Sequence, residues 1–392
     1  MKKVILLLCC FTCMLNLLSC SEKSSDKIAY SNYSAPQYDL VSLEMGSDTL
    51  HFALNDTTYN NVSSLNVFNS AGKEYLAIHD GRSGSINFFD LQSQQLTKQI
   101  FIKDHFNNVN IERLTVFCAN FDSLFLGVDS KMLYMFDSAG IVKNTIDVSG
   151  MTHDVIDVRT SRPMVIKDSI VFAAFSPAHV LINKKDLNDW KMMYGINLKN
   201  NKGRKHYHLP QLYRENLFGF HFMHFSYCYN NHGKFVFSFP ADPNIYETDL
   251  SDLQSVHYGK SRYQDGEITP VSNKLLKRGE GGRQYHIRDA YGAIYFDPFA
   301  KRYLRYFRQK VPDDAHFAVN RKNPQESVVI FDEELKIIGE SGISRDVSFS
   351  SLFTTQSGKT YVRINTQDEN MLHFVELHYK ERNSDQVNLI KK

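Results

Sequence analysis

The sequence SLFLGVDSKMLYMFDSAGIVKNTIDV, residues 123–148, contains three short runs of the kind that form β-strands. The runs cover residues 124–128, 132–136 and 142–148, and two turn-prone breaks separate them. The last run alternates between apolar and polar side chains, which is typical of a strand with one buried face. This segment is therefore predicted to form an antiparallel meander.

Similar meanders recur along the chain, at the spacing of about 45–60 residues that is typical of blade-like repeats. Six sets of strands are expected, and their first strands begin at Ser64, Leu114, Pro163, Phe225, Ala293 and Phe349. The third strand of each set is expected to end at an acidic residue, namely Asp90, Asp137, Asp186, Asp249, Asp332 or Glu376. Short carboxylates accept backbone N–H bonds in turns, so we interpret the aspartates as turn formers rather than catalysts.

The repeat pattern predicts an all-β fold, a six-bladed β-propeller over residues 38–380. The sixth set lacks an outer strand, whereas two strand-like runs, residues 38–45 and 49–54, precede the first complete set. We expect one of these runs to close the last blade, because closure removes a free sheet edge. The ring is then one domain, and a polar tail follows over residues 381–392.

The N-terminus has the features of a processing signal. Lys2 and Lys3 precede an apolar run over residues 4–18, which is too short to span a bilayer. The run ends in Leu-Leu-Ser-Cys at residues 17–20, which resembles the bacterial lipobox. We expect a signal peptide over residues 1–19, a lipid on Cys20 and a tether over residues 20–37; the alternative is an ordinary cleaved signal. Ser21 favours the outer membrane, with the side of the membrane left open.

Composition indicates a folded chain without a strong charge preference. The sequence is 42% hydrophobic and 13% aromatic, enough to build a large core. Without residues 1–19, the chain has 43 basic and 43 acidic residues, which gives no electrostatic reason to expect a nucleic-acid partner. Two cysteines follow Cys20 in the sequence. These are Cys118 and Cys228, which lie in apolar runs and are predicted to be buried free thiols.

No standard catalytic motif is present in the sequence, so we assign no catalytic residue. The two longest connectors between strand sets, residues 197–224 and 260–292, mix aromatic residues with Arg and His, a combination favoured at recognition surfaces. Together with the connector before the third set, they supply the candidate ligand-binding residues: Tyr207, Arg214, His221, His224, Arg283, Tyr285, Arg288, Asp154 and Arg162.

Each of these groups has a second interpretation. Arg283 and Arg288 suit an anionic group, or they pair with a loop acid such as Asp289. The same two interpretations apply to the group Asp154, Asp157, Arg159 and Arg162. Histidines recur in the first connector, but no Cys or carboxylate stands at a matching spacing. We therefore expect no metal and no cofactor.

A lipobox, a polar tether and six irregular meanders together resemble the uncharacterised propeller lipoproteins of Bacteroidota, which are grouped as a domain of unknown function. The resemblance implies a propeller and a lipid anchor, but no activity. We expect a membrane-anchored module that binds a protein or glycan ligand at its connector face. The alternative is a hydrolase or lyase that acts on glycan or peptide at the mouth of the central channel.

Overall fold

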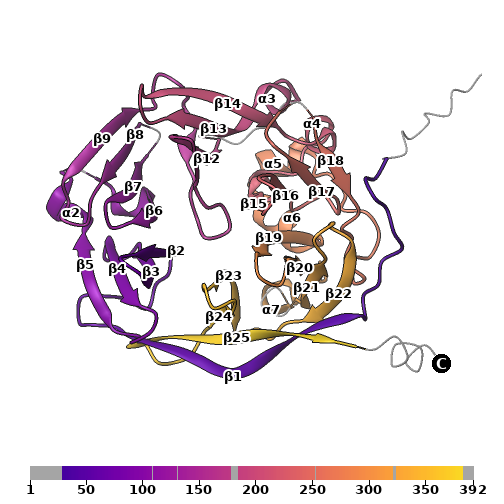
Figure 1. Ribbon diagram of the computed structural model, residues 1–392. Coiled ribbons are helices and arrows are strands. Elements are labelled where there is room, and N and C mark those ends of the chain that lie inside the picture. The colour runs from indigo at the N-terminus through magenta and orange to yellow at the C-terminus, as the bar shows by residue number, and fades with distance from the viewer. Residues whose placement is uncertain are drawn as a thin grey trace, which may run out of the picture.

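Consecutive antiparallel sheets follow one another around a ring in the computed structural model (Figure 1). The structure describes residues 29–382 except 108, 130, 178–183, 252 and 321–323. The predicted all-β, propeller-like arrangement is confirmed. The predicted signal peptide, Cys20 and most of the C-terminal tail lie outside the described residues. Within the described ranges, no helix is long and apolar enough to cross a membrane.

The first two sheets have four strands each, in chain order from the inside of the ring outward. The first contains β2 (Ser64–Ser70), β3 (Lys73–Asp80), β4 (Ser85–Asp90) and β5 (Leu96–Phe101). The second contains β6 (Leu114–Asn120), β7 (Ser123–Val128), β8 (Met132–Phe136) and β9 (Val142–Asp147). The meander predicted over residues 123–148 therefore exists as β7, β8 and β9.

The third sheet has an interrupted inner strand. It contains β10 (Val155–Ile156), β11 (Val165–Lys167), β12 (Ile170–Ser176), β13 (Lys191–Asn197) and β14 (Lys202–His208). The prediction was wrong about its outer strand: residues 190–196 form the third strand instead, and β14 falls in what was expected to be a loop. The first four residues of β14 are all exposed, so its sequence has no alternation of apolar and polar side chains. The strand is defined instead by its backbone hydrogen bonds to β13. The expected strand over residues 180–183 lies outside the described residues.

The fourth sheet is again a four-stranded meander, and the remaining strands form one eight-stranded sheet. The fourth contains β15 (Ser226–Tyr229), β16 (Phe235–Ser238), β17 (Ile245–Thr248) and β18 (Ser255–His257). The eight-stranded sheet runs in the order β19 (Ala290–Asp297), β20 (Arg302–Arg308), β21 (Glu326–Phe331), β22 (Ile337–Gly342), β1 (Val41–Ala53), β25 (Met371–Glu381), β24 (Thr360–Ile364) and β23 (Val347–Thr354).

The ends of the chain meet in this last sheet. β1 pairs antiparallel with β25 over ten residue pairs, with a register shift between Met45 and Thr49. Its contact with β22 is a single parallel pair, Val41 with Gly339. The pairing of the N-terminal segment with the last strands was predicted, but the two candidate runs are one continuous strand.

Aspartate side chains shape most of the turns after the third strands, as predicted. Asp90 Oδ1 accepts the N–H groups of Gln92 and Ser93 at 3.0 and 2.8 Å. Asp137, Asp249 and Asp332 accept backbone N–H groups in the same way. The exceptions are Asp186, which lies in a helix, and Glu376, which lies within β25. In the third sheet Asn197 takes the aspartate's place and accepts the N–H of Lys199 at 2.9 Å.

Apolar side chains fill the spaces between neighbouring sheets. Phe88 of the first sheet and Phe136 of the second, for example, belong to one buried cluster. Cys118 and Cys228 are buried and free, which confirms that prediction.

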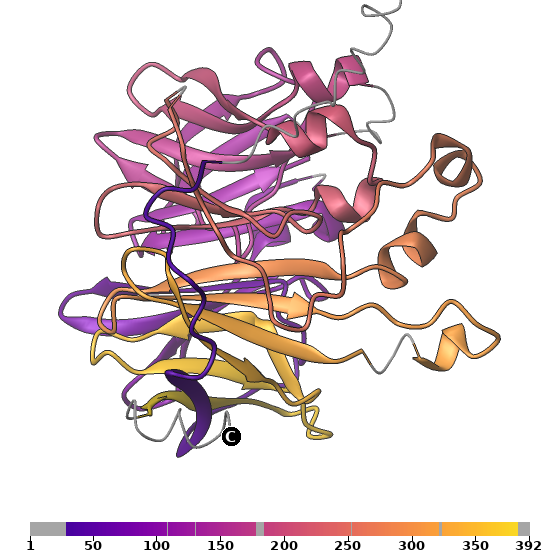
Figure 2. The same ribbon diagram turned by 90° about the vertical axis from the view of Figure 1, so that its right-hand side faces the viewer.

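Short helices gather at one end of the strands. They are α2 (Ile102–His105), η1 (Ile111–Arg113), α3 (Lys184–Asp189), α4 (Gln211–Glu215), η2 (Phe220–Met223), α5 (Asn273–Lys277), α6 (Gly281–His286) and α7 (Phe317–Asn320). Each lies in a connection between two sheets or between the second and third strands of a sheet, and in an up-and-down meander these connections share one end. Figure 2 shows the helices of the second half of the chain standing out from that side of the ring. We call it the connector face.

Candidate functional site

A loop of the third sheet, residues 157–164, leaves the inner strand between β10 and β11 and enters the centre of the ring (Figure 1). We call it the axial loop. The N–H of Leu65 in β2 donates to Oγ1 of Thr160 at 2.9 Å. On the other side, Tyr227 N–H and Ser226 Oγ in β15 both donate to the carbonyl of Ser161, at 3.1 and 2.8 Å. The axial loop therefore joins the first, third and fourth sheets across the axis.

A buried ion pair holds the base of the axial loop. Arg162 is buried, its guanidinium donates to the carboxylate of Asp157 and to the carbonyl of Phe225, and it lies over the Phe225 ring. Ser176 Oγ and Arg159 Nε also donate to Asp157. Burial alone would raise the pKa of Asp157, but Arg162 and Arg159 outweigh it and hold this pKa well below its ordinary value. Asp157 is thus a permanently charged acceptor and not a general base.

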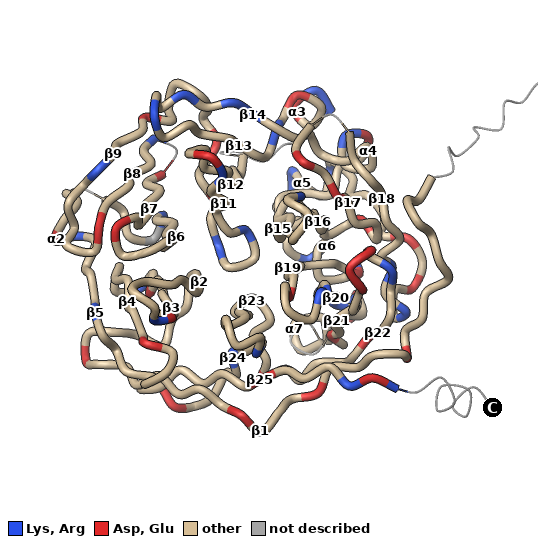
Figure 3. The backbone as a smooth tube through the Cα atoms, in the orientation of Figure 1, with Lys and Arg blue, Asp and Glu red and all other residues tan. Residues whose placement is uncertain are grey.

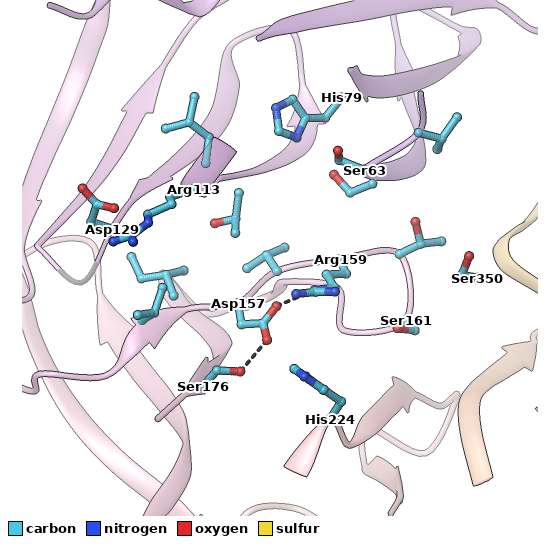
Figure 4. Close-up of a pocket in the computed structure, with 18 of the residues that line it drawn as sticks. Ser63, His79, Arg113, Asp129, Asp157, Arg159, Ser161, Ser176, His224 and Ser350 are labelled. Atoms are coloured by element: carbon cyan, nitrogen blue, oxygen red, sulfur yellow. Dashed lines mark hydrogen bonds and ion pairs between the residues drawn. The ribbon is translucent and has the colours of Figure 1, made fainter. Parts of the chain in front are cut away.

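A cavity of about 850 Å³ opens beside the axial loop, toward the connector face. Figure 4 shows side chains converging on it from several sheets. The ends of β2, β3 and β6, the strand β10, the axial loop, η2 and β23 all contribute to its wall. Thirteen of its twenty lining residues are polar or charged, so the cavity suits a polar ligand.

Three buried polar atoms in this wall have no hydrogen-bond partner among the described residues: His79 Nε2, Thr115 Oγ1 and Asp129 Oδ1. His79 is only 3% exposed. Burial lowers the pKa of His79 to about 4, against a smaller opposing effect of Asp80, so the imidazole is neutral at pH 7. Buried polar atoms without partners are costly, which indicates that something polar completes them.

His224 faces the same cavity from the connector side (Figure 4). An arginine cannot accept a hydrogen bond, so the 3.3 Å contact from Arg162 Nη2 makes His224 Nδ1 the acceptor and places the ring proton on Nε2. Burial and then Arg162 lower the pKa of His224 to about 4. His224 is therefore a neutral hydrogen-bond donor. The ring of Phe220 lies edge-on to it, with centroids 4.7 Å apart.

Two arginines line the cavity: Arg113, the last residue of η1 directly before β6, and Arg159 in the axial loop. The Arg159 side chain is 56% exposed, and only its Nε is engaged by Asp157. Figure 3 shows basic and acidic residues interspersed around the rest of the ring. The cavity wall also combines both signs, since Asp129 and Asp157 line it with the two arginines, and it adds the neutral imidazoles of His79 and His224.

Of the nine candidates chosen from the sequence, His224 is the one that lines the cavity, and the buried Arg162 contacts it through Nη2 at 3.3 Å. Arg162 forms the ion pair that was one of its two interpretations, and its guanidinium contacts Asp157, Phe225 and His224. Asp154 accepts hydrogen bonds from Thr152, Trp190 Nε1 and Tyr194 OH, and it does not line the cavity.

The connector candidates lie outside the cavity wall, and most are already engaged. Arg283 pairs with Asp313, and Tyr285 packs under Arg308 and against His221. Arg288 donates to Thr269, Pro270 and Gln284, not to Asp289. Tyr207 in β14 stacks on Phe237 and donates to Gln254 at 2.6 Å, while Arg214 lies in α4. The structure does not bring these residues into one site.

Sequence reasoning missed His79, Arg113, Asp129 and Phe220. The first three lie where an inner strand begins or a second strand ends at the connector face, so the repeat itself could have pointed to these positions. Within the described residues, no group of three or more His, Cys, Asp or Glu could hold a metal ion.

Comparison with known proteins places this arrangement in a family. The model of a domain of unknown function, DUF4221, matches residues 40–342. The chain belongs to the DUF4221 family. A structure of another DUF4221 member, from Bacteroides vulgatus ATCC 8482, superposes with a TM-score of 0.72 at 20% identity, covering 88% of this chain and 100% of its own.

A second structure has the same fold at lower similarity. It is a presumed exported protein from Bacteroides fragilis NCTC 9343, with a TM-score of 0.53 at 10% identity, covering 90% of this chain and 98% of its own. No curated protein shows a significant match. For this DUF4221 protein the comparisons establish the fold and the family, and the function is inferred from the residues of the site.

Proposed function

We propose that this DUF4221 protein is a lipid-anchored β-propeller of the cell envelope that binds a polar ligand in its central cavity. The observation that carries the proposal is the set of buried, unpartnered polar atoms in the wall, His79 Nε2, Thr115 Oγ1 and Asp129 Oδ1. A rigid ring that positions such atoms at an open end is a pre-organised binding site.

The ring is proposed to have six blades. The eight-stranded sheet divides into two four-stranded halves, because β22 and β1 share one parallel residue pair whereas every other neighbouring pair is an antiparallel ladder of five or more residue pairs. With the four separate sheets this gives six sectors. In this view β1 is the outer strand of the sixth blade, and its contact with β22 is where two blades touch.

The envelope location rests on the sequence of residues 1–20 and on the presumed export of one structural neighbour. We propose that Cys20 carries the lipid and that the outer membrane is its destination. Metabolic labelling with a radioactive or alkyne palmitate tests this. Wild-type protein is expected to be labelled and to fractionate with outer membranes, and Cys20→Ala to lose both properties. Labelling that survives in Cys20→Ala would contradict the proposal.

Binding in the cavity is tested by blocking it. A ligand-observed NMR screen of the purified chain with neutral sugars, acidic sugars and short peptides provides the ligand. Ser350 is exposed on β23 and lines the cavity, so Ser350→Trp is expected to abolish binding. The matched control is Ser251→Trp, an exposed serine in the turn between β17 and β18, at the opposite end of the strands. Equal binding by both variants would exclude the cavity as the site.

A second candidate, a hydrolase or lyase, is favoured by one observation. His79 Nε2 is an unpartnered nitrogen of a neutral imidazole in the cavity wall, so it can accept a proton, and its pKa of about 4 makes it a weak general base. Turnover of a glycan or peptide that is lost in His79→Gln, with ligand binding retained, would establish the enzyme. A catalytic histidine is usually oriented by a carboxylate. The carboxylate of the axial loop, Asp157, is already bound by Arg159 and Arg162, so it does not orient His79.

A further inference from the structure

In the cavity wall Arg113 lies beside Asp129, one charge of each sign (Figure 4), so the charge balance of the site is decided at the axial loop, where the charges do not cancel. The single carboxylate of Asp157 is shared by two guanidinium groups, Arg162 and Arg159. Arg162 is buried and uses its donors on Asp157, Phe225 and His224. The excess positive charge is therefore presented by Arg159, whose Nη atoms have no partner among the described residues and whose side chain is open to the cavity. A guanidinium with two free donors on one edge matches a carboxylate or phosphate.

The rest of the wall suits alcohol groups. Hydroxyls from Ser63, Thr115, Ser161 and Ser350 line the cavity, together with the two neutral imidazoles of His79 and His224. A hydroxyl can both donate and accept a hydrogen bond, as can the hydroxyl of a sugar, while His224 can donate from Nε2 and His79 has an unpartnered Nε2. A ligand with several adjacent hydroxyls would complete this set without introducing a buried charge.

One aromatic side chain completes the site. Phe220 at the mouth of the cavity is 40% exposed, although it is a large apolar residue next to a polar wall. His224 fixes its ring from one edge. An open aromatic ring beside hydrogen-bonding groups is suited to a molecule that is apolar on one face and polar around its rim, which describes a pyranose ring.

We propose that the cavity binds an acidic sugar, with its carboxylate or phosphate on Arg159, one face of a ring on Phe220 and its hydroxyls on His79 and His224. This inference rests on the proposed binding function and gives its ligand class. The cavity lies near the upper end of the roughly 300–1,000 Å³ of typical ligand sites, so it has room for more than one sugar unit.

Isothermal titration calorimetry of the purified chain tests the inference with named probes. Digalacturonate and glucose 6-phosphate supply the two kinds of acid, and galactobiose and glucose are their neutral counterparts. We expect at least one acidic probe to bind at least about 10-fold more tightly than its neutral counterpart, because charge-assisted hydrogen bonds are the stronger ones. The better acidic probe identifies the acid as carboxylate or phosphate.

Arg159→Gln is the decisive variant, because glutamine can still donate to Asp157 while Arg162 keeps that carboxylate paired. It is expected to weaken acidic probes about 10-fold or more and to leave neutral probes unchanged. Arg159→Lys should retain part of the preference, and Arg204→Gln, on the exposed strand β14, should behave as wild type. Circular dichroism and the urea midpoint of each variant confirm that it is folded.

Two results would overturn the inference. The first is the absence of an acidic preference, seen either as equal affinity for acidic and neutral probes or as no binding of either acid at millimolar concentration. The second is an acidic preference that survives Arg159→Gln. Either result is distinguishable from failure of the binding function, because a neutral sugar or peptide that is blocked by Ser350→Trp would still occupy the cavity.

Discussion

Leu65 and Thr160 are 95 residues apart in the chain, and the backbone N–H of Leu65 donates to Oγ1 of Thr160 at 2.9 Å inside the ring. Leu65 belongs to the first sheet and Thr160 to a loop of the third. An isolated strand at the inside of a ring has no neighbour for its inward polar groups, so the axial loop supplies one. The centre of this ring is therefore a set of contacts between sheets and not a simple pore.

Thr160→Val tests this contact. Valine has the shape of threonine without the acceptor, so the N–H of Leu65 loses its partner, and the free energy of unfolding should fall by about 1–3 kcal/mol. Urea denaturation followed by circular dichroism gives the value. Thr145→Val, at an exposed position of β9, is the control and should change stability by less than about 0.5 kcal/mol. Similar values for the two variants would show that the axial contact is dispensable.

Arg305 is predicted to be irreplaceable by lysine. It is fully buried, and its guanidinium lies 3.7 Å from the ring centroid of Tyr291. Its nitrogens donate to Ser238 Oγ and to four backbone carbonyls, which belong to Phe239, Asp242, Pro243 and Gly259. Lysine cannot reach this planar set of acceptors, so Arg305→Lys should lose about 1–3 kcal/mol of unfolding free energy.

The measurement for Arg305 is the urea midpoint, with Arg204→Lys on exposed β14 as the control. Arg305→Met, which leaves all five acceptors without a donor, should be less stable than Arg305→Lys. A lysine variant as stable as the wild type would mean that charge and not geometry is what this position requires.

His79 should make the protein sensitive to mild acid. Its pKa is lowered to about 4 in the folded state, mainly by burial, whereas in the unfolded chain it is about 6.5. Above pH 6.5 both states are neutral and the full stability is present. As the pH falls from 6.5 toward 4, the unfolded state binds a proton first, so stability decreases by at most an amount on the order of 3 kcal/mol.

Urea denaturation at pH 7, 6 and 5 measures this dependence before most carboxylates titrate. His79→Gln is expected to flatten the decline, and His153→Gln, an exposed histidine of the connector before the third sheet, is expected to leave it unchanged. An unaltered slope in His79→Gln would mean that this histidine is protonated inside the fold.

The pairing of the chain ends depends on Phe52 of β1. Its side chain is fully buried, with ring centroids 5.0 Å from Phe89 and 5.8 Å from Phe374, so it connects the first sheet to the last strand. Phe52→Ala should cost about 3–5 kcal/mol. Met45→Ala, on the same strand but 50% exposed, should cost less than about 0.5 kcal/mol. If thermal unfolding shows similar losses for both, the closing strand contributes through its backbone alone.

Local chemistry explains what could be predicted from the sequence. Alternation in residues 142–148 and the side-chain turns at Asp90 and Asp137 depend on neighbours within a few residues, so the meanders were predictable. The third sheet departed from prediction because β14 is defined by hydrogen bonds to β13 and has no apolar face to recognise.

The candidate site depends on contacts that no local pattern encodes. Arg159 and Arg162 are three residues apart and chemically alike. Arg162 is nevertheless buried against Asp157, whereas Arg159 is open to the cavity. The difference arises because Phe225 and His224, more than sixty residues away, enclose Arg162. The sequence showed the group of charges, and only the fold shows which member a ligand can reach.

The segment before β1 limits the distance between the ring and the membrane. Ser31 N–H donates to the carbonyl of Val256 in β18 and Gln37 N–H to that of Ile337 in β22, so the chain approaches its first strand along the outer edge of the fourth sheet and of the eight-stranded sheet (Figure 1). If Cys20 is lipidated as proposed, the nine residues up to Ala29 span at most about 32 Å. A linker of this length keeps the ring within about one protein diameter of the bilayer. The protein can then bind only ligands that come close to the membrane surface.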